Sequence, residues 1–341
     1  MSQNTSKHSI RYLSKNDIKI LGGASSQLYV NAVSRALQLH AKGDFVQPLK
    51  PYLRANGKDG HIADRIIAMP AYLGDDLPIS GLKWIGSKHD NPMKRDMERA
   101  SGIIILNDSE TNYPIAIMEA SLISAMRTAA VTVIGTRYLA RENFSQITCL
   151  GCGLIAKMQL ISMLEQFKQI RKIHLFDLNQ ESAKLLAKKI QSQFEGVEIS
   201  IAQSAEEAVR QGEVIITATV TDQPYIPFEW IQKGAFISNI SIMDVQKDVF
   251  LNADKVVVDD WDQANREKKI INQLVLEGEF SYEDLHAELG EILLGKKSGR
   301  ESEDEIIILN PMGMAIEDIS SAHEIYRKAI TEQIGTSLSL Y

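Results

Sequence analysis

The sequence predicts an α/β protein in which a domain with a doubly wound parallel sheet is inserted into an α+β domain. Two observations support this prediction. From Ile147 to about residue 259, strand-like and helix-like segments alternate, which is typical of a parallel sheet with helices on both faces. The first third of the chain instead combines a long helical pattern with several strands in succession, which is typical of a mixed or antiparallel sheet.

Length and composition exclude several classes of protein. A chain of 341 residues is expected to form two domains, and its 44% hydrophobic and 24% charged residues are ordinary for a globular protein. The net charge of -7 argues against nonspecific binding of nucleic acid. No apolar run approaches the roughly 18 residues that a membrane span requires. The polar segment Met1–His8 lacks a signal region, so we expect a cytoplasmic protein.

The N-terminal elements are read from hydrophobic spacing. A helix is predicted over residues 27–41. Four strands are expected at residues 65–69, 79–85, 102–106 and 113–119. The polar turn 107–112 predicts that the last two strands form a hairpin, and Ser121 is expected to cap a helix that runs to about Arg141.

The second half predicts a parallel sheet. Its strands are expected at residues 147–150, 172–177, 197–202, 213–219, 235–240 and 255–259. Residues 262–294 have a helical, amphipathic pattern, and the charged segment 295–305 predicts a solvated loop. A strand at 306–309, a turn at 310–313 and a helix to about Ala329 complete the prediction. We therefore expect residues 1–130 and 318–341 to form a substrate-binding and dimerisation domain, and residues 131–317 to form the inserted domain.

A glycine turn after the strand at 147–150 gives the inserted domain a function. Gly151 permits a tight turn, Gly153 allows the backbone to approach a pyrophosphate, and Ala156 lets the following helix pack closely on the sheet. Asp177 follows Gly151 by 26 positions, where a carboxylate binds both ribose hydroxyls and repels a 2′-phosphate. The pattern predicts a Rossmann domain that binds NAD rather than NADP through Gly151, Cys152, Gly153, Leu154, Ile155, Ala156 and Asp177.

Two further segments near this motif were weighed. Thr219, Val220 and Thr221 follow the fourth strand at the carboxyl edge of the sheet, where they are expected to line the cofactor or to serve only as a turn. Cys149 and Cys152 form a C-x-x-C pair. We expect neither redox chemistry nor a metal site from this pair, because Cys149 belongs to a buried strand and the chain has no third cysteine.

Three cations in the N-terminal part stand among apolar or small residues. Arg65 begins a hydrophobic strand, Lys83 lies inside another, and Arg127 lies in a helix of small residues. A buried arginine requires an anionic partner and suits a carboxylate, so each arginine is either a ligand for a substrate carboxylate or half of a structural ion pair. Lys83 either serves the site or points to solvent through strand alternation.

This ordered combination resembles the ornithine cyclodeaminase/μ-crystallin family from end to end. The resemblance is carried by Arg65 followed by Met69-Pro70, by Lys83, and by Arg127-Thr-Ala-Ala before the glycine motif. It implies that Arg65 and Arg127 hold an amino-acid carboxylate beside the nicotinamide, that Gly313 contacts the substrate, and that Lys83 is catalytic. The segments with the most specific likeness are residues 61–70, 81–92, 219–225, 237–244 and 309–318.

The resemblance also implies a catalytic role for Asp244, which follows the fifth strand of the inserted domain. Here the chain departs from the family pattern, because Ile242 and Met243 stand where small, glycine-like residues are usual. An alternative is that Asp244 caps the helix expected at 245–250. Lys88 and His89 lie in a loop of mixed charge that is either solvated surface or a site where one of them meets a further substrate carboxylate.

The implied activity is a dehydrogenase acting on the CH–NH group of a secondary amine. The members that the chain resembles most use NAD to cleave N-(2-amino-2-carboxyethyl)-L-glutamate, a small molecule with several carboxylates, into L-2,3-diaminopropionate and 2-oxoglutarate for siderophore or antibiotic pathways. The alternatives are an ornithine cyclodeaminase that recycles its NAD and a μ-crystallin-like binding protein; alanine-dehydrogenase chemistry fits the Arg127 element less well. The resemblance further implies a homodimer joined through the substrate domain, where open strand edges favour pairing.

Overall fold

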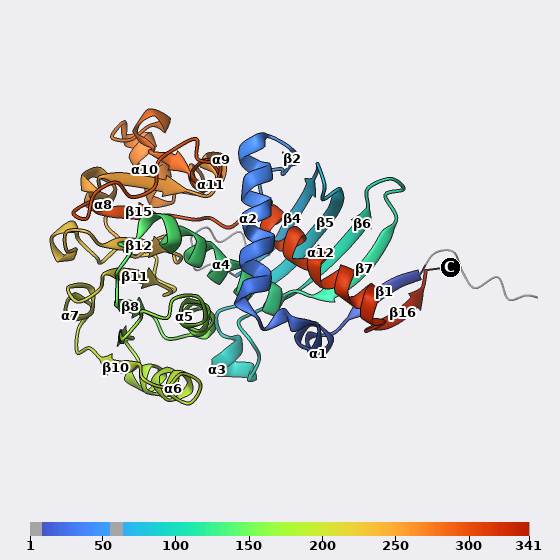
Figure 1. The fold of residues 1–341 in the computed structure, drawn as a ribbon, viewed down its shortest axis with the longest axis horizontal. Coiled ribbons are helices and arrows are strands. Elements are labelled where there is room, and N and C mark those ends of the chain that lie inside the picture. The colour runs from blue at the N-terminus through green and yellow to red at the C-terminus, as the bar shows by residue number, and fades with distance from the viewer. Residues whose placement is uncertain (1–8, 55–63, 341) are drawn as a thin grey trace, which may run out of the picture. The chain divides into compact units, whose positions relative to one another are not determined.

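A computed structural model describes residues 9–54 and 64–340 of the chain. These residues divide into two compact units (Figure 1). Residues 9–54, 64–127 and 314–340 form what we call the outer unit, and residues 128–313 form the inserted unit. The predicted α/β fold class is confirmed, while the functional roles assigned to the two domains remain predictions.

The outer unit contains an eight-stranded, mostly antiparallel sheet in the order β16-β1-β7-β6-β5-β4-β2, with β3 also paired to β4. Its strands are β1 (Ser9–Leu13), β2 (Phe45–Val46), β3 (Tyr52–Leu53), β4 (Arg65–Leu73), β5 (Ile79–Ser87), β6 (Ala100–Asp108), β7 (Pro114–Glu119) and β16 (Thr336–Ser339). The hairpin predicted between the strands at 102–106 and 113–119 is confirmed as the antiparallel pair β6–β7.

Helices of the outer unit cover one face of this sheet. α12 (Ala315–Glu332) packs on β4, β5 and β6, and α2 (Ser26–Lys42) packs against α12, as Figure 1 shows. The shorter helices are α1 (Lys15–Ile18), the π-helix η1 (Lys19–Gly23) and α3 (Asn91–Arg95). Because side chains alternate along a strand, Lys83 on β5 points to the face that contains the buried Met69 and Ile104, and Trp84 points to the other face.

The inserted unit contains a parallel sheet in the order β10-β9-β8-β11-β12-β15-β13-β14. Its strands are β8 (Gln146–Leu150), β9 (Lys172–Phe176), β10 (Glu198–Ile201), β11 (Val214–Thr217), β12 (Phe236–Asn239), β13 (Lys255–Val258), β14 (Ala287–Glu288) and β15 (Ile307–Leu309). The strand order reverses between β8 and β11, and open α/β sheets bind ligands outside the carboxyl ends of the strands at such a point.

The helices of the inserted unit connect these strands. They are α5 (Leu154–Gln166), α6 (Gln180–Gln191), α7 (Ala205–Val209), η2 (Phe228–Trp230), α8 (Lys247–Asn252), α9 (Trp261–Ala264), α10 (Ile270–Glu277), η3 (Tyr282–Asp284) and α11 (Leu289–Leu293). α4 (Ser121–Leu139) contains the boundary between the units at residues 127 and 128.

Two sequence-based expectations need correction, and some strands were missed. Residues 262–294 are not one helical stretch: α9 ends before Glu267 and Lys268, whose φ angles are positive, and α10 ends at Gly278, which adopts the left-handed conformation. Ser121 does not cap α4 from outside. It is the first residue of α4, and the carboxylate of Glu119 accepts hydrogen bonds from the backbone N–H groups of Ser121 and Leu122. The strands β1, β2, β3, β14 and β16 were not predicted.

Candidate active site

The glycine turn follows β8 and leads into α5 in the inserted unit. Gly151 has a φ of +85°, and a Cβ atom at this position would lie 2.7 Å from the carbonyl oxygen of Ala218, so only glycine fits. A Cβ atom on Gly153 would meet no protein atom within 4 Å, and no side chain caps the N-terminus of α5. Open space in front of uncapped helical N–H groups fits a pyrophosphate.

Asp177 lies beside this turn, directly after β9. Its carboxylate accepts hydrogen bonds from the backbone N–H of Cys152 (2.7 Å) and of Asn179 (2.8 Å). The acid and the turn are therefore joined in one arrangement, as the spacing of 26 residues predicted. The remaining residues of the predicted loop, Leu154, Ile155 and Ala156, form the first turn of α5.

Both cysteines are free and buried in the structure. Burial raises the pKa of the Cys149 thiol well above its usual range and that of Cys152 to about 12, with a smaller contribution from the nearby Asp177 carboxylate. A thiol reacts as its thiolate, so raised pKa values oppose redox activity.

Asp244 is fully buried below the carboxyl ends of β11 and β12. Thr219 Oγ1 (2.8 Å) and the Tyr225 hydroxyl (3.0 Å) donate to its Oδ1, and Ser241 Oγ contacts its Oδ2. Asp244 does not cap the next helix, since the N-cap residue of α8 is Gln246. Burial raises the pKa of Asp244, although the three hydroxyl groups act in the opposite direction.

Ile242, two positions before Asp244, adopts an unusual backbone conformation. Ile242 has a φ of +63°, a left-handed conformation that is costly for a β-branched side chain. Glycine would adopt it without strain, which explains why small residues are usual here in the family pattern. Asp244 follows this turn, and its catalytic role remains a prediction.

A buried chain of hydrogen bonds extends from Asp244 into the sheet. Ser241 Oγ donates to Thr217 Oγ1 (2.7 Å), Thr217 Oγ1 donates to Asn239 Oδ1 (2.8 Å), and Asn239 Nδ2 donates to Asn310 Oδ1 (2.7 Å). Ser241 has only one hydroxyl proton, which lies between Thr217 Oγ1 and the Asp244 carboxylate and serves one of them at a time.

The chain predicts opposite effects for two small substitutions. Thr217→Val removes the acceptor for the Ser241 proton, which frees that proton for the carboxylate, so the pKa of Asp244 should fall. Ser241→Ala removes a donor to the carboxylate, so this pKa should rise. The measurement is a carbon-13 NMR titration of protein labelled at its aspartate carboxyl groups, with Asp244→Asn used to assign the signal. Shifts of the same sign in both variants would contradict the hydrogen-bond chain.

The outer unit contains a second buried cluster, built around Asp318 on α12. The Asp318 carboxylate accepts from Lys83 Nζ (2.6 Å) through one oxygen and from Arg127 Nε (3.1 Å) through the other. Arg127 Nη1 also donates to Glu317 (2.8 Å), and Lys83 Nζ lies 3.2 Å from Ser124 Oγ. The side chain of Lys83 is 1% exposed and that of Arg127 10%, so neither points to solvent.

The surroundings of Lys83 in this cluster lower the pKa of its amine. Burial lowers the pKa of Lys83 to about 8; Arg127 adds to this effect, and the Asp318 carboxylate opposes it. An amine with such a pKa exchanges its proton near neutral pH. Sequence reasoning predicted Lys83 and Arg127 as site candidates but missed Asp318 and Glu317. The available signal was a pair of acids inside the otherwise apolar start of the helix expected after residue 313.

The other predicted substrate ligands have different surroundings. Arg65 begins β4, with its guanidinium carbon 5.8 Å from the centre of the Tyr52 ring. Lys88 is exposed and forms an ion pair with Asp64 (2.6 Å). In the inserted unit, Gly313 has a φ of +73°, and its N–H donates to the buried Asp259 (2.6 Å). Thr221 accepts from the N–H of Gln223 as part of a turn, and Val220 is 47% exposed.

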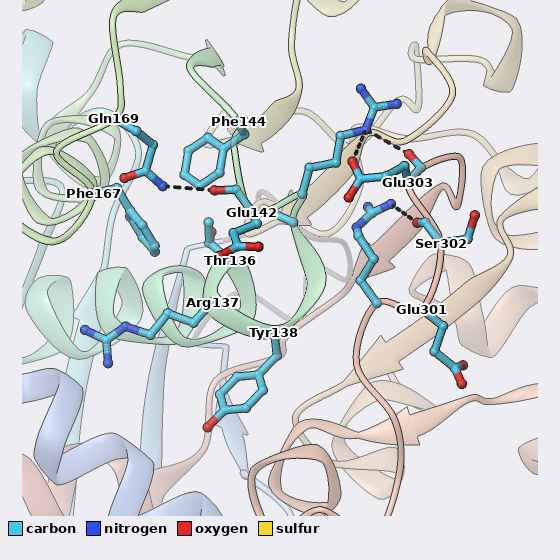
Figure 2. Close-up of a pocket in the computed structure, with 13 residues that line it drawn as sticks. Thr136, Arg137, Tyr138, Glu142, Phe144, Phe167, Gln169, Glu301, Ser302 and Glu303 are labelled. Carbon is cyan, nitrogen blue, oxygen red and sulfur yellow. Dashed lines mark hydrogen bonds and ion pairs between the residues drawn. The ribbon is translucent and has the colours of Figure 1, made fainter.

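A separate pocket lies between the end of α4 and residues 300–303 (Figure 2). Its arginines are engaged by the protein: Arg141 donates to the carbonyl oxygens of Glu303 and Lys233, and Arg300 donates to those of Leu139, Ser302 and Glu305. None of the predicted site residues lines this pocket. The candidate functional residues therefore lie in two clusters, one in each unit.

Fold and geometry thus define a protein with a Rossmann-type dinucleotide unit and a second unit that contains a buried Lys–Asp–Arg cluster. The model of the ornithine cyclodeaminase/mu-crystallin family matches residues 13–333, and the chain belongs to this family. No helix in the described part of the chain is long and apolar enough to cross a membrane.

Several relatives cover nearly the whole chain. N-((2S)-2-amino-2-carboxyethyl)-L-glutamate dehydrogenase of Staphylococcus aureus is 62% identical over 97% of this chain and 98% of its own length. Alanine dehydrogenase of Archaeoglobus fulgidus is 34% identical over 92% of the chain and 93% of its own length. Among solved structures, Δ1-pyrroline-2-carboxylate reductase of Thermococcus litoralis, in complex with NADH and L-proline, has a TM-score of 0.88, with 30% identity, over 96% of this chain and 100% of that one. An archaeal alanine dehydrogenase dimer with bound NAD has a TM-score of 0.86, with 32% identity, over 98% of this chain and 100% of that one.

Proposed function

We propose that this protein is an NAD-dependent dehydrogenase that cleaves N-(2-amino-2-carboxyethyl)-L-glutamate to L-2,3-diaminopropionate and 2-oxoglutarate. The observation that carries the chemistry is the buried Asp318 carboxylate, which holds a lysine with a lowered pKa beside an arginine. The choice of substrate is supported by the relative of that name, which is 62% identical over 97% of the chain.

The residues of the outer unit bind and orient the amine. Arg127 and Arg65 hold the carboxylate next to the reacting carbon, since a guanidinium matches a carboxylate with two parallel hydrogen bonds. NAD, held by the Gly151–Ala156 turn and Asp177, supplies the hydride acceptor when bound. Loss of the hydride and of the N–H proton turns the C–N single bond into an imine. Lys83 must be neutral to take that proton, and a neutral lysine also avoids repelling the positive charge that develops on the carbon.

Asp244 completes the sequence of steps in this proposal. Water adds to the imine carbon, the C–N bond then breaks, and the nitrogen leaves as the amino group of diaminopropionate while the carbon becomes the keto group of 2-oxoglutarate. A carboxylate with a raised pKa is suited to take a proton from the attacking water and to return it to the leaving nitrogen. Thr219, Tyr225 and Ser241 hold that carboxylate in position.

The lowered pKa of Lys83 predicts how the rate depends on pH. Protonated Lys83 cannot accept a proton, so kcat/KM should rise with pH and level off above a midpoint of about 8. Initial rates of NADH formation across the neutral and mildly alkaline range, at saturating NAD, test this expectation. A rate that falls as pH rises through this range would contradict the role of Lys83 as proton acceptor.

We further propose that the protein is a homodimer joined through the uncovered face of the outer sheet. On this face, one row of paired residues crosses five strands: Tyr12, Ile117, Ile105, Leu82 and Pro70. In the next row, Trp84 lies opposite Ile103, and both are 40% exposed. A continuous apolar surface of this kind marks an interface, and a second copy presents the same surface.

A charge placed in this row should separate the subunits. Ile105→Glu is expected to give a monomer by light scattering after size exclusion, because the dimer would bury an unpaired carboxylate. Leu178→Glu is the matched control, since Leu178 is 96% exposed in the inserted unit. Wild-type protein that is monomeric at micromolar concentration would contradict the proposed dimer.

The proposed reaction draws on NAD and on intermediates of amino-acid metabolism, so we place the enzyme in the cytoplasm. There it would supply diaminopropionate for the assembly of a siderophore or an antibiotic. A gene deletion that lowers production of such a compound, and is rescued by added L-2,3-diaminopropionate, is the expected result.

The decisive experiment mixes the protein, NAD and synthetic N-(2-amino-2-carboxyethyl)-L-glutamate. We expect NADH to accumulate and mass spectrometry to identify both products in equal amounts. Ornithine serves as the control substrate. Proline formation from ornithine without net NADH would instead indicate a cyclodeaminase, and inertness toward every amino-acid substrate would indicate a binding protein.

A further inference from the structure

Arg99, which precedes β6 in the outer unit, is a cation without an acidic partner among residues 9–54 and 64–340. Its guanidinium makes one side-chain hydrogen bond in the described part of the chain, a long one to Ser87 Oγ (3.5 Å), and no ion pair. The neighbouring Arg95 differs in this respect, since it is paired with Asp90 (2.7 Å). A guanidinium has five N–H donors, so most of those of Arg99 remain available.

The surroundings of Arg99 are cationic and partly removed from water. Burial and the positive charge of Arg65 lower the pKa of Arg99. Burial and then Arg99 lower the pKa of His89, whose Nε2 is buried with no hydrogen-bond partner among the described residues. Asp64 lies in the same region, but its carboxylate is engaged by Lys88 Nζ and by the backbone N–H of His89. Arg99 is thus a half-buried cation whose remaining donors suit an anionic ligand.

Strand register places this region on the same face as the catalytic lysine. Arg65 pairs with Ser87, and Met69 pairs with Lys83, so the two pairs are four residues apart on the same strands. Four residues span about 13 Å, and even-numbered separations keep side chains on one face. Arginine and lysine side chains shorten that gap from both ends. The long Arg65 side chain extends toward Lys83, whereas Arg99 lies beside Ser87 at the far end, so a ligand that contacts both Lys83 and Arg99 must carry a carboxylate well away from its reacting carbon.

We propose that Arg99 is a specificity-determining residue that binds a second carboxylate of the substrate, distinct from the one next to the reacting carbon. This inference rests on the proposed function, because that substrate has three carboxylates. It distinguishes a polycarboxylate amine from alanine, whose single carboxylate leaves Arg99 without a ligand. Lys88 fits this role less well, because Asp64 and Asp90 already neutralise its charge.

Steady-state kinetics test the proposal through Arg99→Gln. We expect KM for N-(2-amino-2-carboxyethyl)-L-glutamate to rise about 10- to 100-fold, as befits the loss of a charged hydrogen-bonded pair, with kcat within about twofold of the wild-type value. The KM of Arg99→Lys should lie between those of the wild type and Arg99→Gln, since lysine keeps the charge but loses the planar fork. Arg95→Gln is the matched control and should leave both constants unchanged.

A binding measurement separates this inference from the proposed reaction. Propane-1,2,3-tricarboxylate should raise the melting temperature of the wild-type protein more than acetate does, and Arg99→Gln should abolish the difference. If the amine is not turned over while this difference holds, the proposed function fails and the anion site stands. An unchanged KM together with an unchanged response to the tricarboxylate would overturn the inference. Ser87→Ala, which removes only the hydrogen bond to Arg99, provides the same test with a weaker effect if Arg99→Gln does not fold.

Discussion

Lys83→Met is expected to lower kcat by about 10²- to 10⁴-fold, the usual contribution of a positioned proton-transfer group. Methionine has a similar length and no titratable group, and Asp318 keeps Arg127 as a partner, so the buried carboxylate is not left without a cation. Single-turnover formation of NADH measures the effect on the chemical step. Near-normal NADH production at saturating substrate would contradict the assignment of Lys83.

A second variant separates charge from proton exchange at this position. Lys83→Arg keeps a cation beside Asp318, but a guanidinium does not release its proton near neutral pH. We therefore expect this variant to be as inactive as Lys83→Met. Recovery of activity in Lys83→Arg would mean that a fixed positive charge is sufficient. NAD affinity, measured by protein fluorescence, should be unchanged in both variants.

Asp177→Ser is expected to reverse the choice of cofactor. The carboxylate is placed beside the glycine turn by the N–H of Cys152, where it binds ribose hydroxyls and repels a 2′-phosphate. Two hydrogen bonds to a charged group account for a loss of about 10²- to 10³-fold in kcat/KM with NAD, while NADP should improve because the repulsion is removed.

The measurement for Asp177→Ser is the ratio of kcat/KM values for NAD and NADP with the same amine substrate. Glu181→Gln is a suitable control, because Glu181 is an exposed acid nearby on α6 whose carboxylate pairs with Lys184. Its ratio should equal that of the wild type. A preference for NAD that survives in Asp177→Ser would show that another group discriminates against the 2′-phosphate.

Local patterns in the sequence were sufficient for most of the inserted unit. Most of its parallel strands are short apolar runs between turns. Gly151 and Asp177 have positions that backbone geometry dictates. The helical stretch expected at 262–294 was wrong because hydrophobic spacing does not report positive φ angles, which Glu267 and Lys268 adopt between α9 and α10.

The candidate site was harder to predict because its contacts are distant in sequence. Lys83 and Asp318 are 235 positions apart, and Arg127 and Asp318 are 191 apart. No local pattern links such residues, so a buried lysine looked equivalent to one that points to solvent. The same reason hid the hydrogen-bond chain from Asp244 to Asn310, in which Thr217 ends β11, Asn239 ends β12 and Asn310 follows β15.

The discontinuity of the outer unit determines the order in which the protein can mature during translation. The inserted unit, residues 128–313, is contiguous and has its own core, so it can fold as soon as it leaves the ribosome. The outer sheet must wait until α12 arrives to cover the face with Lys83. During that interval Lys83 and Arg127 lack Asp318, and the face of the sheet that α12 later covers is exposed to solvent. A nascent chain stalled before residue 314 should therefore bind chaperones through its N-terminal third while its dinucleotide unit is already native.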